Sequence, residues 1–338
     1  MALHRVRVLA TPPAGRAREL ASVSRTLIEA QRRGMRAEEA TGFYLLAVMH
    51  YKSEDLPEAY RDALKAIEAG RAADPETVAR HLGNSARCLA MLEREMPRAQ
   101  ALLEETGALA DRLGIEVIDI PWGQGIASAF AGDGAGAARL LGRALEIARS
   151  IGDHWAEWDC LARLVMLELE AGHASAARER CAELAPVAAR MGEGREWPFT
   201  AALEAMADLV AGEAGAGQRL EVATDALRAA DARGLLAYTL LFIADDDLRA
   251  GRTSLARSRA EEALRAAELV GRYSEVALAR ALLVRAALAD QDHSGVEANL
   301  VALRRDLQRP TDLSARARAA VEAALDIGLQ TLAPTPPG

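Results

Sequence analysis

The stretch GDGAGAARLLGRALEIARSIGDHWAEWDCLARLVMLELEAG, from Gly132 to Gly172, contains one full period of the pattern that decides the fold. In its first half, apolar residues recur at intervals of three and four, at Ala138, Leu141, Leu145 and Ala148. This spacing places them on one face of an α-helix. A glycine follows, and glycine ends helices readily because it adopts the left-handed conformation without strain. The stretch therefore predicts two helices joined by a short turn.

Turn-forming residues recur at a regular interval along the whole chain. Turn-like positions fall at Ser53, Arg94, Gly132, Gly172, Gly212, Gly251 and Gln291, with spacings of 41, 38, 40, 40, 39 and 40 residues. A second series interleaves with the first, at Gly34, Gly70, Gly114, Gly152, Gly192, Gly234 and Gly271. Two series with one period indicate two helices per repeat. One such pair cannot bury its apolar stripe alone, so the pattern predicts about seven stacked pairs with a continuous core.

Particular residue types mark the expected helix starts and the positions where two helices pack closely. Asp55 and Asp74 stand where N-caps are expected, and Pro57 and Pro75 follow within the first helical turn. Small residues recur early in the second helix of each pair, where two helices must approach closely. These residues are Ala59, Ala99, Ala138, Ala177, Gly217 and Ala256.

Composition supports an all-α protein. Hydrophobic residues make up 51% of the 338 residues, but aromatic residues only 4%, and few β-branched residues are present to build a sheet. The net charge of −8 gives no general attraction to nucleic acids or anionic lipids, so neither direct nucleic-acid binding nor membrane binding is expected. The three cysteines form no C-x-x-C pair, and no segment has the pattern of a secretory signal or a membrane span. These features predict a soluble, cytoplasmic protein.

Two stretches carry a resemblance to a known superfamily. They are AGAARLLGRALEIA at 135–148 and SLARSRAEEAL at 254–264. They resemble the tetratricopeptide superfamily, and more closely its relatives of about 40 residues per repeat in the helical sensor domains of bacterial LuxR-type, ATP-dependent transcription activators. The resemblance covers residues 16–309 and implies a right-handed superhelix whose first helices line a concave surface. Neither the phosphate-binding motif G-x-x-x-x-G-K-[ST] nor a separate basic helical segment occurs, so the resemblance extends only to the sensor or scaffold part.

The sequence also suggests boundaries. Residues 1–15 are a lead-in, 16–309 form the repeat domain, 310–332 form a helix that caps the last repeat, and 333–338 are a disordered, proline-rich tail. One irregularity lies inside the array, at Ile115–Gly123, where a β-branched run and Pro121 delay the next helix. Such a departure can mark a site, although an insertion between repeats is the more common explanation.

The aromatic residues are unevenly placed. Twelve of thirteen fall in or just before first helices, and Tyr60 is the exception. The resemblance implies that Tyr44, Trp122, Trp158, Phe199 and Tyr238 step along one groove. Aromatic rings offer large contact area at little entropic cost, which suits recognition. The alternative is that these rings wedge between neighbouring hairpins as core.

Charged residues on the first helices suggest what such a groove would prefer. Asp159 and the run Asp245–Asp247 would place carboxylates near the rings, and Arg163 a positive charge. An acidic, aromatic groove favours a basic peptide or a small cation, whereas a solvated helix face is the alternative. The candidate partner-binding residues are Tyr44, Tyr51, Asn84, Trp122, Trp158, Asp159, Arg163, Phe199, Tyr238 and Asp245.

These features predict a non-enzymatic scaffold that binds a protein or peptide segment in its concave groove, in bacterial signalling or transcriptional control. The alternative is a sensor in which an aromatic pocket of the same groove closes on a small-molecule effector. No nucleophile–base pair and no metal-ligand spacing can be proposed from the sequence, so neither catalysis nor a cofactor is expected.

Overall fold

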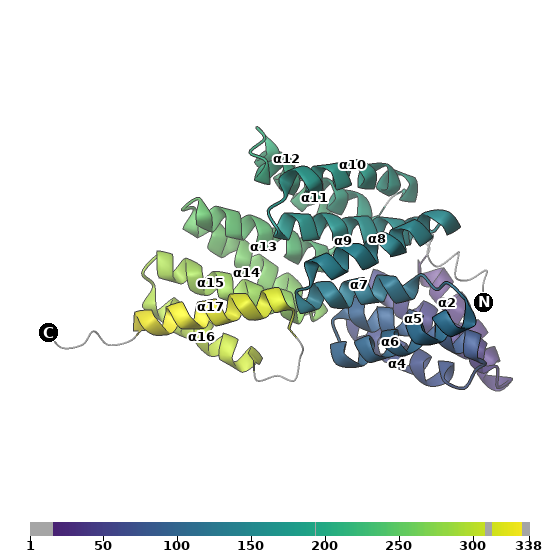
Figure 1. Ribbon diagram of the computed structural model, residues 1–338. Helices are drawn as coiled ribbons and strands as arrows, with labels where there is room; N and C mark the ends of the chain where they lie inside the picture. The colour runs from purple at the N-terminus through teal and green to yellow at the C-terminus, as the bar shows by residue number, and fades with distance from the viewer. Residues whose placement is uncertain (1–15, 193, 308–312, 333–338) are drawn as a thin grey trace. The chain divides into compact units, whose positions relative to one another are not determined.

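A computed structural model describes residues 16–192, 194–307 and 313–332. Over these residues the chain forms sixteen α-helices and no strand, which confirms the expected all-α fold (Figure 1). The helices are α2 (Arg16–Arg32), α3 (Arg36–Lys52), α4 (Leu56–Gly70), α5 (Pro75–Leu92), α6 (Met96–Leu113), α7 (Asp119–Ala131), α8 (Gly134–Ile151), α9 (His154–Glu170), α10 (Ala174–Met191), α11 (Glu196–Val210), α12 (Ala216–Ala229), α13 (Arg233–Arg249), α14 (Thr253–Val270), α15 (Tyr273–Ala289), α16 (His293–Leu307) and α17 (Ala315–Leu332).

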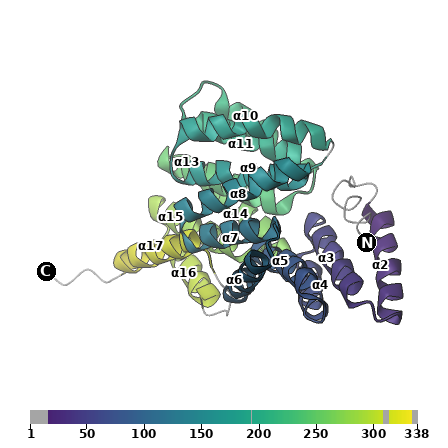
Figure 2. The ribbon, with the colours of Figure 1, turned by 45° about the vertical axis from the view of Figure 1, so that its right-hand side comes forward.

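Seven helical pairs follow α2, from α3 with α4 to α15 with α16, and α17 follows the last pair. Several first helices of successive pairs also contact one another, as α3 does with α5, α5 with α7 and α13 with α15, and these helices form an inner layer. The second helices form an outer layer, and Figure 2 shows α2 to α6 side by side. This is the helical-repeat architecture that the period predicts.

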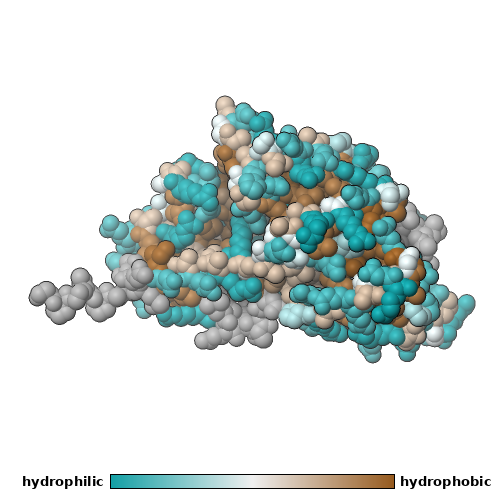
Figure 3. Space-filling model, in the orientation of Figure 1, coloured by the Kyte–Doolittle hydropathy of each residue, from teal (hydrophilic) through white to brown (hydrophobic). Residues whose placement is uncertain are grey.

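The two layers differ in how their helices are buried. Every residue of α5 from Leu82 to Leu92 is buried, because inner helices contact neighbours on several sides. In the outer helix α8, by contrast, Leu141 and Leu145 are buried while Arg143 and Glu146 are exposed. Hydrophilic and hydrophobic residues are accordingly interspersed over the face shown in Figure 3. No described helix combines the length and apolarity that crossing a bilayer requires.

The turns within pairs occur where the first series predicts them. Gly132, Gly172, Gly212 and Gly251 all have positive φ, and Gln291 takes the same conformation at a φ of 58°. In the second series, two glycines, Gly70 and Gly234, do not take the left-handed conformation expected after a helix end. Gly70 is the last residue of α4, where a β-carbon would lie 3.1 Å from that of His81, so its small size serves close packing. Gly234 lies inside α13, and the left-handed residue before that helix is Asp231.

The expected N-caps are confirmed. The Asp55 carboxylate accepts a hydrogen bond from the Glu58 amide at 3.3 Å, and Asp74 accepts one from the Thr77 amide at 3.1 Å. These bonds satisfy amides that have no partner within the helix.

The small-residue series needs two corrections. Ala59, Ala99, Ala177 and Ala256 are buried as expected. At the third and fifth pairs, however, the buried residues are Ala137 and Ala216, one position before the expected Ala138 and Gly217. In α8 the buried residue is the fourth after the N-cap Asp133, as Ala177 is the fourth after the N-cap His173 of α10.

The described chain divides into two compact units, with the boundary between Ala226 and Leu227 inside α12. The sequence predicts one repeat domain over 16–309 and does not indicate this division. In the second unit, Leu313, Ala317 and Val321 of the C-terminal segment pack with Leu300 and Leu303 of α16, so α17 covers the end of the last pair. The lead-in at 1–15, the break at 309–310 and the tail at 333–338 lie outside the described residues.

Candidate functional site

In the first unit, side-chain hydrogen bonds link each inner helix to the next. Tyr44 of α3 is bonded to Arg87 of α5, Arg87 to Asp119 of α7, Trp122 of α7 to Asp159 of α9, and Trp158 of α9 to Thr200 of α11. Each bond joins two residues that are about one repeat apart in the sequence. Side chains on the inner helices of successive repeats therefore contact one another. The inner face is thus held together by specific polar contacts as well as by apolar packing.

Arg87 is the centre of this face. Its Nε donates to Asp119 at 2.6 Å and its Nη2 to the Tyr44 hydroxyl at 2.9 Å. The guanidinium carbon lies 4.1 Å from the Trp122 ring centroid and 5.5 Å from that of Trp155, within the range of cation–π attraction. Burial opposes the charge, but Tyr44 and Asp119 together hold the pKa of Arg87 above its ordinary value, so the guanidinium stays charged. We call Tyr44, Arg87, Asp119, Trp122 and Trp155 the Arg87 cluster.

The irregular segment before α7 supplies the acidic member of this cluster. Asp119 is the first residue of α7, directly after the β-branched run, and its side chain is 2% exposed. With its amide nitrogen turned toward Asp119, Asn84 donates to that carboxylate and, at 3.1 Å, to the Arg80 carbonyl. The late start of α7 therefore places a carboxylate where the Arg87 charge requires one.

Asp159 continues the network into α9. It accepts hydrogen bonds from the Trp122 indole at 2.8 Å and from Arg163 at 2.6 Å. From the preceding position, the Trp158 indole donates to Thr200 at 3.0 Å, and its ring meets Phe199 edge-on at 6.3 Å between centroids. The carboxylate expected to attract a basic ligand is therefore already neutralised within the chain.

An ion pair joins the two ends of the inner face. Arg195, just before α11, bonds to Glu54, just after α3, at 2.9 Å across 141 residues of sequence. The Arg195 and Glu54 side chains are 14% and 11% exposed. Arg195 also lies 5.7 Å from the Tyr51 ring centroid, and Lys52 lies 4.9 Å from that of Trp155. These contacts bring the two ends of the inner layer of the first unit together, so its inner face is covered.

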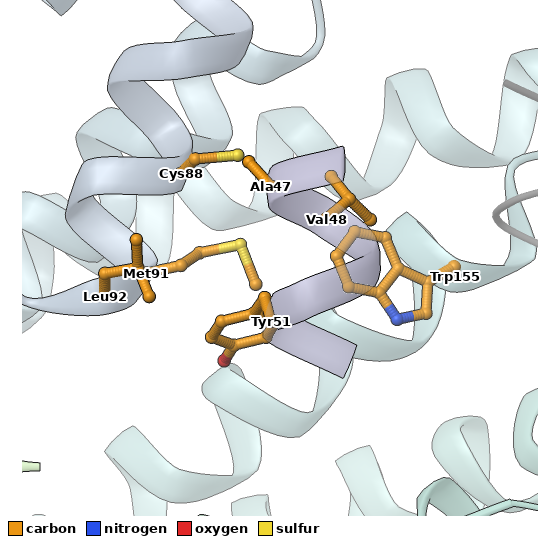
Figure 4. A pocket seen from close by; sticks show the side chains of 7 residues that line it. All are labelled: Ala47, Val48, Tyr51, Cys88, Met91, Leu92 and Trp155. Atoms are coloured by element: carbon orange, nitrogen blue, oxygen red, sulfur yellow. The ribbon is translucent and has the colours of Figure 1, made fainter. Parts of the chain in front are cut away.

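A small hollow lies behind this closure. Figure 4 shows Tyr51 of α3 facing Met91 of α5, with Trp155 of α9 on the other side. The hollow measures about 10 Å³, enough for about one water molecule, and Cys88 is among the residues that line it. Larger occupants would require side chains to move.

The cysteines have the properties of core residues. Cys88, Cys160 and Cys181 are unpaired and buried. Burial raises the pKa of the Cys88 thiol to about 11 and that of Cys181 to about 12, and it raises the pKa of Cys160 as well. All three stay protonated near neutral pH, which makes them poor nucleophiles. Over the described residues, no three His, Cys, Asp or Glu side chains are gathered so that they could hold a metal ion.

In the second unit, the acidic run of α13 is paired with arginines. Asp245 bonds to Arg285 of α15 at 2.6 Å and also to Arg249. Asp247, which is buried, bonds to Arg252 at 2.6 Å and to Arg259. The run is therefore paired with arginines rather than a free acidic patch, and Asp245 and Asp246 remain partly exposed.

The prediction that the aromatic rings lie exposed along a groove is wrong, both for the rings of the first unit and for Tyr238. Tyr44, Trp122, Trp158, Phe199 and Tyr238 are each less than a tenth exposed, as are Asn84 and Asp159. Tyr51, Arg163 and Asp245 are half-buried. The inner layer of the first unit does bring Tyr44, Tyr51, Asn84, Trp122, Trp158, Asp159, Arg163 and Phe199 together, whereas Tyr238 and Asp245 belong to the second unit. Whether these residues bind a partner stays a prediction.

Three members of the Arg87 cluster were not among the candidates from the sequence: Arg87, Asp119 and Trp155. A signal for Arg87 was present, because it stands alone among apolar residues in Ala86–Leu92 on a helix with no polar face at that level. Asp119 lies in the segment that the sequence marks as irregular. No local pattern identifies Trp155, because its contacts with Arg87 and Lys52 span more than one repeat.

Comparisons with known proteins do not assign a family. No protein-family model and no curated protein matches the sequence. Among solved structures, the crystal structure of BtubC (BKLC) from P. vanneervenii is similar with a TM-score of 0.48 and 17% identity, over 64% of this chain and 91% of that chain.

Proposed function

We propose that this protein is a non-enzymatic interaction scaffold that binds a protein segment along the inner face of its first unit. By its resemblance to the sensor domains of transcription activators, it serves bacterial signalling or transcriptional control. The observation that carries the proposal is the inner layer itself, which concentrates tyrosine, tryptophan and arginine behind one ion pair, Glu54–Arg195. These three residue types contribute most to binding energy at protein interfaces.

The inner face is built in a way that stability alone does not explain. A buried ion pair such as Arg87–Asp119 contributes little net stability, because taking two charges out of water costs about as much as their attraction returns. Apolar residues of the same size would pack the same space at least as well. Buried groups that keep their hydrogen bonds do, however, hold rings and charges in fixed positions, ready for a segment that replaces the internal contacts.

Binding in this proposal requires the closing contact to open. The Glu54–Arg195 pair is largely buried, so the cost of taking its two charges out of water offsets most of their attraction and the pair contributes little net stability. A minor open population would then exist before the partner arrives, and the partner would shift the equilibrium toward it. Removing the pair should strengthen binding, and locking it should abolish binding.

The test uses two opposed variants of the full chain. Arg195→Ala removes the pair, whereas Glu54→Cys/Arg195→Cys joined by a bismaleimide locks it. The native cysteines are buried with raised pKa values, so the introduced thiols react first. Each tagged protein is used to capture proteins from its host's lysate, with mass spectrometry as the readout. We expect a specific protein to bind the wild type, to bind Arg195→Ala several-fold more, and to be lost after cross-linking.

Two controls separate opening from general effects. Arg71→Ala breaks an exposed ion pair with Glu105 at 3.3 Å, remote from the inner face, and should capture like the wild type. The double-cysteine variant without cross-linker should capture like Arg195→Ala. If the cross-linked protein retains the same partner as the wild type, the inner face is not the binding surface.

The hollow between Tyr51, Met91 and Trp155 favours a second candidate, a sensor for a small apolar effector. Met91 is unbranched and flexible, so the hollow can widen without backbone movement. Purified protein would be denatured and the released small molecules identified. Ala47→Leu fills the hollow, so a compound released by the wild type and absent from this variant would support a sensor. Release of the same compound by both proteins would contradict it.

A further inference from the structure

A second and larger hollow lies elsewhere in the first unit, between α6, α7 and α8. It measures about 340 Å³, which falls within the usual range of small-molecule sites. It opens beside the irregular segment, where Gly114 to Ile118 connect α6 to the late start of α7. Gly107 lines it, and a β-carbon there would be in van der Waals contact with Ile120 at 3.5 Å.

The floor of this hollow is apolar and packed. Ala110, Val117 and Ile120 form a buried cluster, with Ile115 packed against it, and Ile147 of α8 contributes from the other side. Such a floor suits an aliphatic chain, whose transfer from water is favourable by about 0.8 kcal/mol per buried methylene.

The walls carry charges that have no partner in the described structure. Asp111 and Glu116 lie on the side of α6 and its following turn, Arg143 on α8, and Gln124 on α7. Among the described residues, none of these four side chains forms a hydrogen bond or an ion pair, whereas Arg149 of α8, outside the hollow, is bonded to both Glu157 and Glu183. Glu104, also on α6, accepts a hydrogen bond from Gln100 at 3.3 Å. Three exposed carboxylates and one exposed guanidinium therefore stand around the hollow, within reach of a ligand.

We propose that this hollow binds a basic α-amino acid of the lysine type. Such a molecule has one carboxylate for Arg143, two cationic groups for the acidic wall and a methylene chain for the apolar floor. Its net charge of about +1 complements the excess of carboxylates in the walls. Glu104 and Asp111 are seven residues apart on α6, or about 10 Å along the helix axis. Each carboxylate can therefore pair with a different one of the ligand's two cationic groups. This site is independent of the inner face on which the proposed function rests.

Calorimetric titration of the full chain with three probes tests each contact. The probes are L-lysine, cadaverine, which lacks the carboxylate, and L-norleucine, which lacks the terminal ammonium. We expect L-lysine to bind at least about tenfold more tightly than either of the others, because each loses one charge-assisted hydrogen bond.

Variants assign the contacts to residues. Arg143→Ala should abolish the preference for L-lysine over cadaverine, and Asp111→Asn/Glu116→Gln the preference over L-norleucine. Arg139→Ala and Glu146→Gln are the matched controls, since both residues are exposed on α8 and line no part of the hollow. Gly107→Leu should block binding by filling the space, with the fold checked by circular dichroism. No saturable binding of L-lysine at millimolar concentration, or binding that Arg143→Ala leaves unchanged, would overturn the proposal.

Discussion

At the scale of single residues, the first unit depends on how Arg87 is compensated. Its side chain is fully buried, so its positive charge has lost the hydration that a surface arginine keeps. Asp119 supplies the opposite charge, Tyr44 an acceptor oxygen, and Trp122 and Trp155 their ring faces. Removing one of the two charges leaves the other buried without compensation, which costs far more than the pair contributes.

We therefore expect Arg87→Met to lower the free energy of unfolding by about 3–5 kcal/mol, measured by urea denaturation. Arg87→Met/Asp119→Leu removes both charges and should recover most of the loss. Arg139→Met, on an exposed position of α8, should change the free energy by less than about 0.5 kcal/mol. An unchanged midpoint for the single variant would show that Arg87 is hydrated in solution.

At the scale of helices, inner and outer layers are joined in different ways. Outer helices are linked by ion pairs about 34 residues apart, such as Arg149–Glu183 at 2.8 Å and Arg228–Glu262 at 2.6 Å. These pairs are partly exposed, so each is worth at most about 1 kcal/mol. The close approach of two helices within a pair depends instead on buried small residues, which have no room for a larger side chain.

The register of these small residues can be tested at neighbouring positions of α8. Ala137 is fully buried and Ala138 is not. Ala137→Leu should therefore lower the free energy of unfolding by about 1–3 kcal/mol through overpacking, whereas Ala138→Leu should have an effect below about 1 kcal/mol. Both substitutions have nearly the same helix propensity cost, so the difference reports packing. Equal effects, or the reverse order in thermal or urea unfolding, would show that the helix is rotated from its described orientation.

At the scale of the whole molecule, the chain divides into two units that each have a core. The second unit contains its own buried cluster, from Ala277 to Ala324. In a repeat array, stability is a sum of local terms between neighbours, so parts with separate cores can unfold separately.

All four tryptophans, at 122, 155, 158 and 197, lie in the first unit. Tryptophan fluorescence should therefore follow unfolding of the first unit alone, while circular dichroism follows both. We expect the two urea curves to have different midpoints. Phe242→Trp adds a probe to α13 of the second unit, and its extra fluorescence change should coincide with the transition that the native tryptophans do not report. Coincident curves for all probes would show that the chain unfolds as one unit.

The period of about 40 residues, the helix spacing and the capping residues determined the all-α repeat fold from the sequence, because these signals depend on contacts within one or two neighbouring helices. Asp55 and Asp74 cap the helices they were expected to cap. Only the tertiary structure decided that Tyr44, Trp122 and Trp158 are buried rather than exposed. Their environment depends on Arg87, Asp119 and the Glu54–Arg195 contact across 141 residues, and no local pattern encodes how tightly successive repeats curl upon one another. Small rotations between neighbouring pairs accumulate along the array, and their sum determines whether the inner face is an open groove or a closed core.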